Sequence, residues 1–171
     1  MPGSPCLGMT PPFRDPGYHR LRAGRRSLPH HAYLITTVTI GRERRFACHA
    51  TAIATVDALV QEGLWLEARL LCWVLMPDHL HALVHLGASE PLSSLMRRVK
   101  CITATAANRI DKRQGPVWMP GFHDRAVRHV DDLDRIARYV LDNPVRAGLV
   151  TDASEYPYLS CAPETSATRG L

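Results

Sequence analysis

The side chains best suited to bind a metal ion are two histidines separated by one residue. His79 and His81 follow the turn signal Pro77-Asp78 and lie in a stretch of alternating character, 79–85. Successive side chains of a strand point to opposite faces, so both imidazoles project the same way, about 6–7 Å apart at their bases. Imidazole is the commonest protein ligand for transition metals, and two rings at this spacing can converge on one ion. The alternative is that both histidines only form the polar face of an amphipathic strand.

The composition limits the class of protein. The chain has 171 residues and a formal net charge of +5, and arginine supplies nearly all of the positive charge. Arginine binds phosphate in a two-pronged fashion, so this bias fits a polyanionic partner, although a GC-rich genome would produce it too. Five cysteines without a C-x-x-C pair argue against a disulfide framework or a thiolate zinc site and favour a reducing cytoplasm. The longest apolar run, 70–76, is too short to cross a bilayer, so no membrane partner is expected.

We divide the chain into three parts. Residues 1–24 are rich in Pro and Gly and then basic, which predicts a flexible N-terminal arm. Residues 25–158 are expected to form one folded domain, large enough to bury a core. Residues 159–171 return to small and polar side chains and are expected to form a C-terminal tail.

Hydrophobic periodicity predicts alternating strands and helices in this domain. Strands are expected over 31–40, 64–76, 79–86 and 117–127, and helices from 47 to Gly63, from Pro91 to the break at Gly115-Pro116 and over 131–143. The second and third strands form a hairpin through a tight Met-Pro-Asp connection. This order is the βαββαβ pattern of a ferredoxin-like α+β fold, with an antiparallel sheet and an added C-terminal helix. In that topology the strand that carries both histidines is central.

The final helix offers a nucleophile. Projection at 100° per residue places Tyr139 and Asn143 on one flank of the apolar stripe, about one turn apart. A flank position can face an active site while the stripe contacts the sheet. Pro144 ends or kinks the helix and weakens this pairing. The alternative is that Tyr139 only shields the edge of the core.

Three motifs together resemble a known family. They are Pro77-Asp78-His79-Leu80-His81, then Trp118 with Phe122-His123-Asp124-Arg125, then Tyr139-Val140-Leu141-Asp142-Asn143-Pro144-Val145-Arg146-Ala147-Gly148-Leu149-Val150. The combination resembles the single-tyrosine HUH transposases, and within them the REP-associated tyrosine transposases of bacteria. The resemblance runs from about Gly24 to Tyr158. It implies a ferredoxin-like fold, a divalent metal (Mg²⁺ or Mn²⁺), and cleavage and rejoining of single-stranded DNA near hairpins.

Matched position by position, the resemblance implies a role for each site residue. His79 and His81 match the metal-binding pair, Tyr139 matches the nucleophile, and Asn143 falls where the family places a further metal-binding side chain. Attack by Tyr139 on a scissile phosphate would leave a 5′-phosphotyrosine and a free 3′-OH. A second 3′-OH could then rejoin strands without ATP, because the ester keeps the bond energy. Histidine with one oxygen ligand suits Mn²⁺ as well as Mg²⁺.

Basic side chains are expected to contact the DNA. The family's basic segment, which recognises a guide sequence beside the hairpin, falls around Arg25 and Arg26. For the basic residues as a group, phosphate binding is favoured over ordinary surface charge. The residues predicted for this role are Arg25, Arg26, Arg42, Arg44, Arg97, Lys100, Arg125 and Arg128. His123 and Asp124 stay open between orienting a ligand and ending a strand.

Three functions remain open at this point. The first is a DNA strand transferase that acts through Tyr139. The second is a DNA-hairpin-binding regulator without turnover, and the third is a metal-dependent phosphodiesterase that activates water. The rival nucleophiles are Tyr18, Tyr33, Tyr156 and Tyr158. The protein is expected in the bacterial cytoplasm, associated with the nucleoid, as a monomer or a homodimer.

Overall fold

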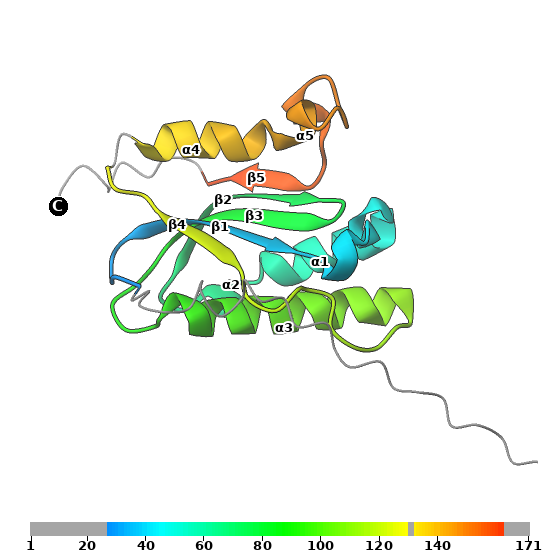
Figure 1. Cartoon of the computed structure of the whole chain (residues 1–171), viewed down its shortest axis with the longest axis horizontal. Helices are drawn as coiled ribbons and strands as arrows, with labels where there is room; N and C mark the ends of the chain where they lie inside the picture. Colours follow the sequence, from blue (N-terminus) through cyan, green and yellow to red (C-terminus); the bar gives the residue numbers. More distant parts are fainter. Residues whose placement is uncertain (1–26, 130–131, 163–171) are drawn as a thin grey trace, which may run out of the picture.

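A five-stranded antiparallel sheet separates two layers of helices (Figure 1). The computed structural model describes residues 27–129 and 132–162. The strands are β1 (Ala32–Val38), β2 (Arg69–Met76), β3 (His79–His85), β4 (His123–Ala126) and β5 (Leu159–Cys161). The helices are α1 (His49–Leu59), α2 (Glu62–Trp65), α3 (Leu92–Asp111), α4 (Asp132–Leu141) and α5 (Asn143–Arg146), and the 3-10 turns are η1 (Ile40–Arg42), η2 (Arg45–Ala47) and η3 (Ala153–Glu155).

The strand order β4-β1-β3-β2-β5 confirms the ferredoxin-like topology. Strand β3 lies at the centre and pairs with β1 on one side and β2 on the other. The predicted hairpin is also confirmed, since Met76 of β2 faces His79 of β3 across the turn. Strand β5 was not predicted. Residues 159–161, assigned to the tail, pair with β2 at the sheet edge, and a strand of three residues is too short to show alternation.

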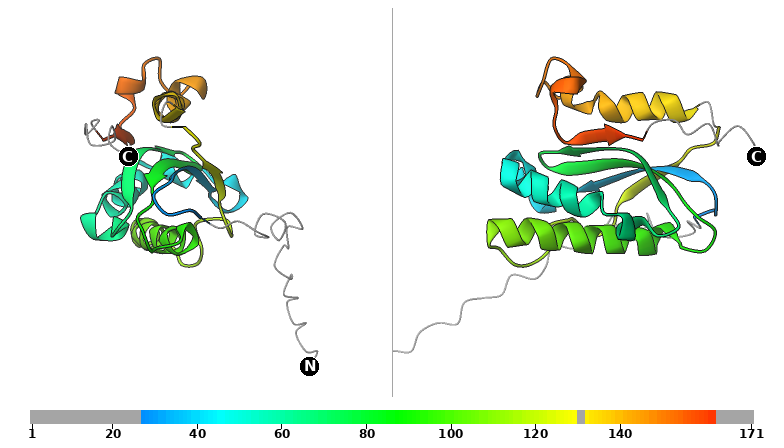
Figure 2. Two further views of the ribbon diagram at one scale, coloured as in Figure 1. Left: turned by 90° about the vertical axis from the view of Figure 1, so that its left-hand side faces the viewer. Right: turned by 180° about the vertical axis from the view of Figure 1, so that it is seen from behind.

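Each face of the sheet has its own hydrophobic core. Leu80, Ala82 and Val84 of β3 belong to the core beneath α1 and α3, whereas Leu83 belongs to the core beneath α4. The side view in Figure 2 shows the sheet between these two helical layers. Strand alternation therefore directs His79 and His81 toward the α4 layer, and the common face that the sequence predicted for them is confirmed.

Several element boundaries differ from the prediction. Helix α1 ends at Leu59, and Gly63 lies inside the short helix α2 instead of ending α1. Leu64 and Trp65, which the prediction assigned to the strand, are buried as part of α2. The strand begins at Arg69. Of the segment 117–127, only β4 and an isolated bridge to Thr39 are extended. The predicted arm, 1–24, and residues 163–171 of the predicted tail lie outside the described residues.

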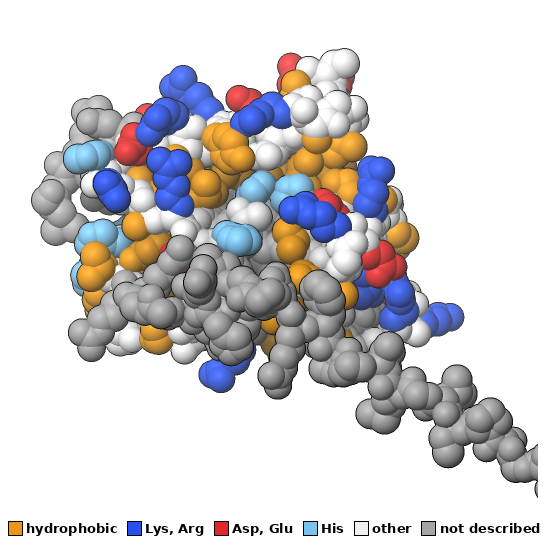
Figure 3. Space-filling model, viewed as in Figure 1, with side chains coloured by type: hydrophobic (Ala, Val, Ile, Leu, Met, Phe, Trp, Pro, Cys, Tyr) orange, Lys and Arg blue, Asp and Glu red, His pale blue; other side chains and the backbone are white. Residues whose placement is uncertain are grey.

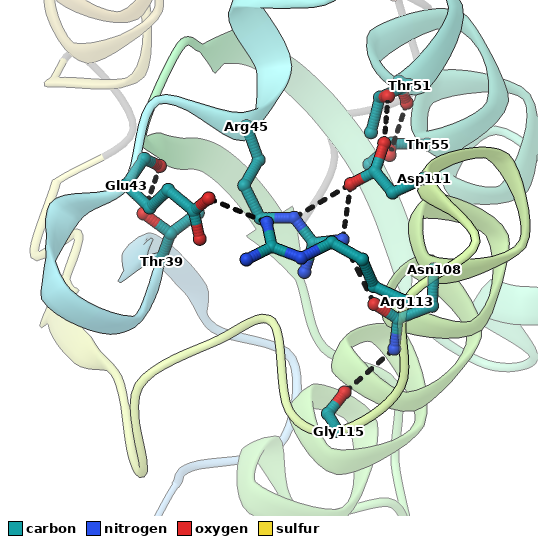
Figure 4. A network of polar contacts seen from close by, with 9 residues as sticks. All are labelled: Thr39, Glu43, Arg45, Thr51, Thr55, Asn108, Asp111, Arg113 and Gly115. Carbon is teal, nitrogen blue, oxygen red and sulfur yellow. Dashed lines mark hydrogen bonds and ion pairs between the residues drawn. The ribbon is translucent and has the colours of Figure 1, made fainter.

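A polar network fixes the segment before α1 (Figure 4). The Arg45 guanidinium forms an ion pair with Asp111 and donates a hydrogen bond to Asn108, both on α3. Asp111 also accepts a hydrogen bond from Thr51 of α1. The next residue, Phe46, donates its backbone N–H to the carbonyl oxygen of Pro77 at 3.0 Å. The network therefore helps to hold the turn that precedes His79.

Arg45→Met is expected to lower the free energy of unfolding by about 3 kcal/mol, because it strips the charge partner from a largely buried carboxylate. The Arg45 side chain is only 6% exposed and that of Asp111 16%. Arg113→Met is the control, since its ion pair with Glu43 is about half exposed and contributes less than about 1 kcal/mol. Urea unfolding measures both. Equal effects would contradict a structural role for the Arg45 ion pair.

Candidate active site

The two histidines of β3 lie side by side on the face beneath α4. Their ring centroids are 4.7 Å apart and the ring planes are nearly perpendicular. His81 is 8% exposed, and the His79 side chain is 17% exposed. On the face drawn in Figure 3, histidine side chains lie near the middle of the view, and Lys and Arg side chains lie above them and to either side.

Each imidazole is held through its Nδ1 atom. The Thr36 hydroxyl on β1 is hydrogen-bonded to His81 Nδ1 at 2.7 Å. The Asp78 carboxylate accepts a hydrogen bond from His79 Nδ1 at 2.5 Å. Arg42 in turn donates to Asp78 at 3.3 Å. Both Nε2 atoms are thereby left for a ligand, which is the usual arrangement around metal-binding histidines.

The electrostatics keep His81 neutral near pH 7. Burial and then the neighbouring His79 lower the pKa of His81, and Asp78 opposes them only in part, so that the pKa is about 4. For Asp78, burial raises the pKa, but the hydrogen bonds and charges of His79 and Arg42 outweigh burial and lower it. Asp78 is therefore ionised near neutral pH, where His81 is in the neutral form that binds metals.

Helix α4 carries Tyr139 to the same place. Its ring centroid is 6.1 Å from that of His81, and the residue is 41% exposed. The Arg146 guanidinium carbon lies 4.8 Å from the Tyr139 ring centroid, in cation–π geometry. Tyr139 is thus in contact with a neutral imidazole and with a cation.

Asn143 lies where the helix breaks. The sequence placed it in the same helix as Tyr139, but α4 ends at Leu141 and Asn143 begins α5. Its Nδ2 donates to the Tyr139 carbonyl oxygen at 2.7 Å and to the Val140 carbonyl oxygen at 3.3 Å. These bonds satisfy the last carbonyls of α4. The Oδ1 atom is the part of Asn143 that suits a metal ligand.

The donor atoms fit a divalent metal. Two imidazole nitrogens and an amide oxygen are donors of the kinds that suit Mn²⁺ or Mg²⁺. Within residues 27–129 and 132–162, no group of three or more His, Cys, Asp or Glu side chains is arranged to hold a metal ion.

The predicted DNA-contacting residues are spread over both faces. Arg42 is paired with Asp78 beside the site. Arg125 of β4 is the cross-strand partner of Leu34 of β1, which packs against the core on the α4 side, so Arg125 also lies on that side. Arg97 is exposed on α3, on the other side of the sheet. Arg44 and Arg128 are exposed. Arg25 and Arg26 lie outside the described residues.

Sequence reasoning did not identify the cations next to the tyrosine. A shallow surface hollow beside Tyr139 is lined by Asp134, Arg135, Arg138 and Asp142. Their spacing along α4 places them near Tyr139 and could have indicated this. Arg146 belongs to the quoted Asn-Pro-Val-Arg-Ala-Gly motif, and its contact with the Tyr139 ring spans the junction between α4 and α5.

The strand register places His123 and Asp124 on opposite faces of the sheet. His123 faces Thr36 across β4 and β1, and Thr36 faces His81 across β1 and β3. His123 therefore lies on the α4 side, two strands from His81. Asp124 faces Ile35, which is buried in the opposite core.

Lys100 differs from its predicted role. Its ammonium group donates hydrogen bonds to the carbonyl oxygens of Met119 and Gly121, at 2.5 and 2.7 Å. Burial lowers the pKa of Lys100 to about 8. Its position does not suit the predicted phosphate contact, because the ammonium group is used to fasten the loop before β4 to α3.

Lys100→Met is expected to lower the free energy of unfolding by about 2 kcal/mol, because two carbonyl oxygens lose a charged donor. Arg97→Met, one turn earlier on the exposed side of α3, is expected to change it by less than about 0.5 kcal/mol. Thermal and urea unfolding of the two variants give the comparison. A Lys100 variant as stable as the wild type would show that these bonds add nothing.

The chain belongs to a family of transposases: residues 29–143 match the family described as "Transposase IS200 like". Within that family, it is similar to the "REP-associated tyrosine transposase" of Escherichia coli K12, with 29% identity over 87 residues. The match covers 50% of each chain, so the chain spans about half the length of this curated relative. The resemblance seen in the sequence motifs is confirmed.

A solved structure has the same fold. It is a REP-associated tyrosine transposase bound to a REP hairpin, with a TM-score of 0.62, 19% identity and 79% of each chain covered. This likeness confirms the α+β architecture. None of the helices in residues 27–129 and 132–162 has the length and apolar composition needed to cross a bilayer.

Proposed function

We propose that this protein cleaves and rejoins single-stranded DNA beside hairpins, with Tyr139 as the nucleophile. The observation that carries the proposal is the approach of the Tyr139 ring to 6.1 Å from His81, whose Nε2 is left for a ligand. A tyrosine that only shielded the core would not need to stand beside two oriented imidazoles. Family membership makes strand transfer the reaction that best uses this arrangement.

The metal would be held by His79 Nε2, His81 Nε2 and Asn143 Oδ1. A bound Mg²⁺ or Mn²⁺ supplies charge neutralisation at a phosphate oxygen. The chain's own residues do the positioning. Thr36 and Asp78 fix the two rings, and the bond from Asn143 to the end of α4 ties the third donor to the helix that carries Tyr139.

The covalent step uses the phenol oxygen. Tyr139 Oη forms a bond to phosphorus, the bond from phosphorus to the 3′ oxygen breaks, and the 3′ oxygen leaves as a hydroxyl while the phenol loses its proton. The product is a 5′-phosphotyrosine, which keeps the phosphodiester bond energy. A second 3′-OH can reverse the step on another strand. No external energy source is required.

The partner is proposed to be DNA that carries a hairpin, as in the solved relative. Exposed arginines on the α4 side, including Arg125 and Arg138, lie on the face where a strand must reach Tyr139. Phosphate contacts of this kind position the strand without reading its sequence. We place the activity in the bacterial cytoplasm.

A 3′-labelled single-stranded hairpin tests the proposal. With Mg²⁺ or Mn²⁺, labelled DNA is expected to become covalently attached to the protein, and EDTA is expected to prevent attachment. A fully duplex DNA of the same sequence serves as the control substrate. Cleavage without attachment would instead indicate a water-activating phosphodiesterase, and binding without cleavage a silent regulator.

Arg146→Ala is expected to slow adduct formation about tenfold at saturating DNA, because the ring loses its stacked cation. Arg138→Ala is the matched control, since it removes the same charge from the residue next to Tyr139. Both substitutions should weaken DNA binding. Single-turnover kinetics separate the rate of adduct formation from DNA binding. An equal loss of rate in both variants would exclude a specific role for the contact between Arg146 and the Tyr139 ring.

A further inference from the structure

Two cysteines face each other across the edge of the sheet. Cys72 of β2 and Cys161 of β5 are direct partners in the antiparallel register. Cross-strand partners share a face, and Cys72 lies in the core beneath α4. Both side chains therefore point toward the helix that carries Tyr139.

Their backbone geometry suits a disulfide. Backbone hydrogen bonds join Ala162 N to Leu71 O and Leu75 N to Tyr158 O, so the intervening Cys72–Cys161 pair is of the non-hydrogen-bonded type. Residues paired in this way have Cα atoms about 4.5 Å apart, inside the range of about 4.4–6.8 Å found for disulfides. The two sulfurs can meet without a change of register.

The two thiols differ in access. Cys72 is fully buried, and its sulfur donates a hydrogen bond to the Ala137 carbonyl oxygen of α4 at 3.8 Å. Cys161 is exposed on the edge strand. Burial, and then the adjacent Cys161 thiol, raise the pKa of Cys72. An oxidant therefore reaches Cys161 first, and Cys72 is the nearby thiol that completes the reaction.

We propose that Cys72 and Cys161 form a peroxide-sensitive thiol pair that closes to an intramolecular disulfide. The Cys161 sulfur attacks one peroxide oxygen, which gives a sulfenic acid and one water. The Cys72 sulfur then displaces the second oxygen as water and the S–S bond forms. Two thiols are oxidised by two electrons, and one peroxide is reduced to two waters. The disulfide would fix β5 to β2 and remove the thiol that contacts α4.

The other described cysteines provide controls. Cys48 and Cys101 are exposed, and neither is a register partner of another cysteine within the described strands. Cys101 lies on α3, on the opposite side of the sheet. Its substitution by serine should not affect the pair.

The test treats the reduced protein, residues 1–171, with hydrogen peroxide and digests it with trypsin without reductant. Cleavage after Arg69, Arg97, Arg146 and Arg169 places the two cysteines in peptides 70–97 and 147–169. We expect these peptides to appear joined, with two hydrogens less than their summed mass. The joined species should form in Cys101→Ser, be absent in Cys161→Ser and disappear with dithiothreitol.

A second readout does not depend on peptide recovery. The disulfide would close the chain from Cys72 to Cys161 into a long loop, which is expected to raise the Tm of the oxidised protein by at least about 5 °C. The rise should occur in the wild type and in Cys101→Ser and be absent in Cys161→Ser. Peroxide treatment that yields only sulfinic acid at Cys161 or intermolecular disulfides, with no joined peptides, would overturn the proposal. Neither readout requires the proposed DNA cleavage, so the two proposals can fail separately.

Discussion

Tyr139→Phe is expected to abolish covalent attachment of DNA, with a loss of about 1,000-fold or more, because phenylalanine has no oxygen to form the phosphate ester. The rest of the site should stay intact. The Tyr139 ring is 41% exposed, and its contacts with His81 and Arg146 are made by the ring. Hairpin binding and the free energy of unfolding are therefore expected to change little. Gel analysis of a labelled hairpin measures the covalent attachment of DNA, and fluorescence titration measures hairpin binding.

The other tyrosines provide the matched controls. Tyr158 is hydrogen-bonded to His49, Tyr156 donates to the Leu75 carbonyl oxygen, and the Tyr33 oxygen accepts from the Leu28 N–H. Tyr18 lies outside the described residues. Tyr158→Phe is expected to keep the adduct at wild-type level. An adduct that survives Tyr139→Phe, or disappears in Tyr158→Phe, would assign the nucleophile to a different residue.

The sequence predicted side-chain orientation correctly where buried apolar residues recur at the spacing of a strand or a helix. The alternation around His79 and His81 predicted their common face, because a central strand must send its apolar side chains into two cores. The stripe of α4 predicted that Ile136 and Val140 are buried, which leaves Tyr139 on the flank. These features follow from local pattern alone.

The sequence was uninformative where a role depends on distant partners. Lys100 looks like any exposed cation on α3, and only the fold brings two carbonyl oxygens to its ammonium group. Strand β5 has three residues, and it can pair only because the fold leaves one side of β2 without another strand. The contact between Arg146 and Tyr139 spans the junction after Leu141, and periodicity cannot locate that junction to one residue.

His81→Ala is expected to reduce Mn²⁺ affinity and adduct formation by about 100-fold or more, because it removes one of the two imidazoles proposed as ligands at a site with few donors. His85→Ala is the matched control. It lies on the same face of β3, about 13 Å from His81, too far to share an ion. Calorimetric titration with Mn²⁺, without DNA, measures affinity independently of turnover.

Thr36→Val is expected to give a Mn²⁺ affinity between those of the wild type and His81→Ala. A histidine that only filled the core would not produce this intermediate value. The variant keeps both imidazoles but removes the hydroxyl at 2.7 Å from His81 Nδ1, which orients the ring. Loss of such an orienting partner is expected to cost about 10- to 100-fold in metal affinity. If His81 only filled the core, Mn²⁺ affinity would be unchanged in both variants while unfolding became easier. An ordered loss of affinity, greatest for His81→Ala, smaller for Thr36→Val and absent for His85→Ala, requires the imidazole to bind the metal through Nε2.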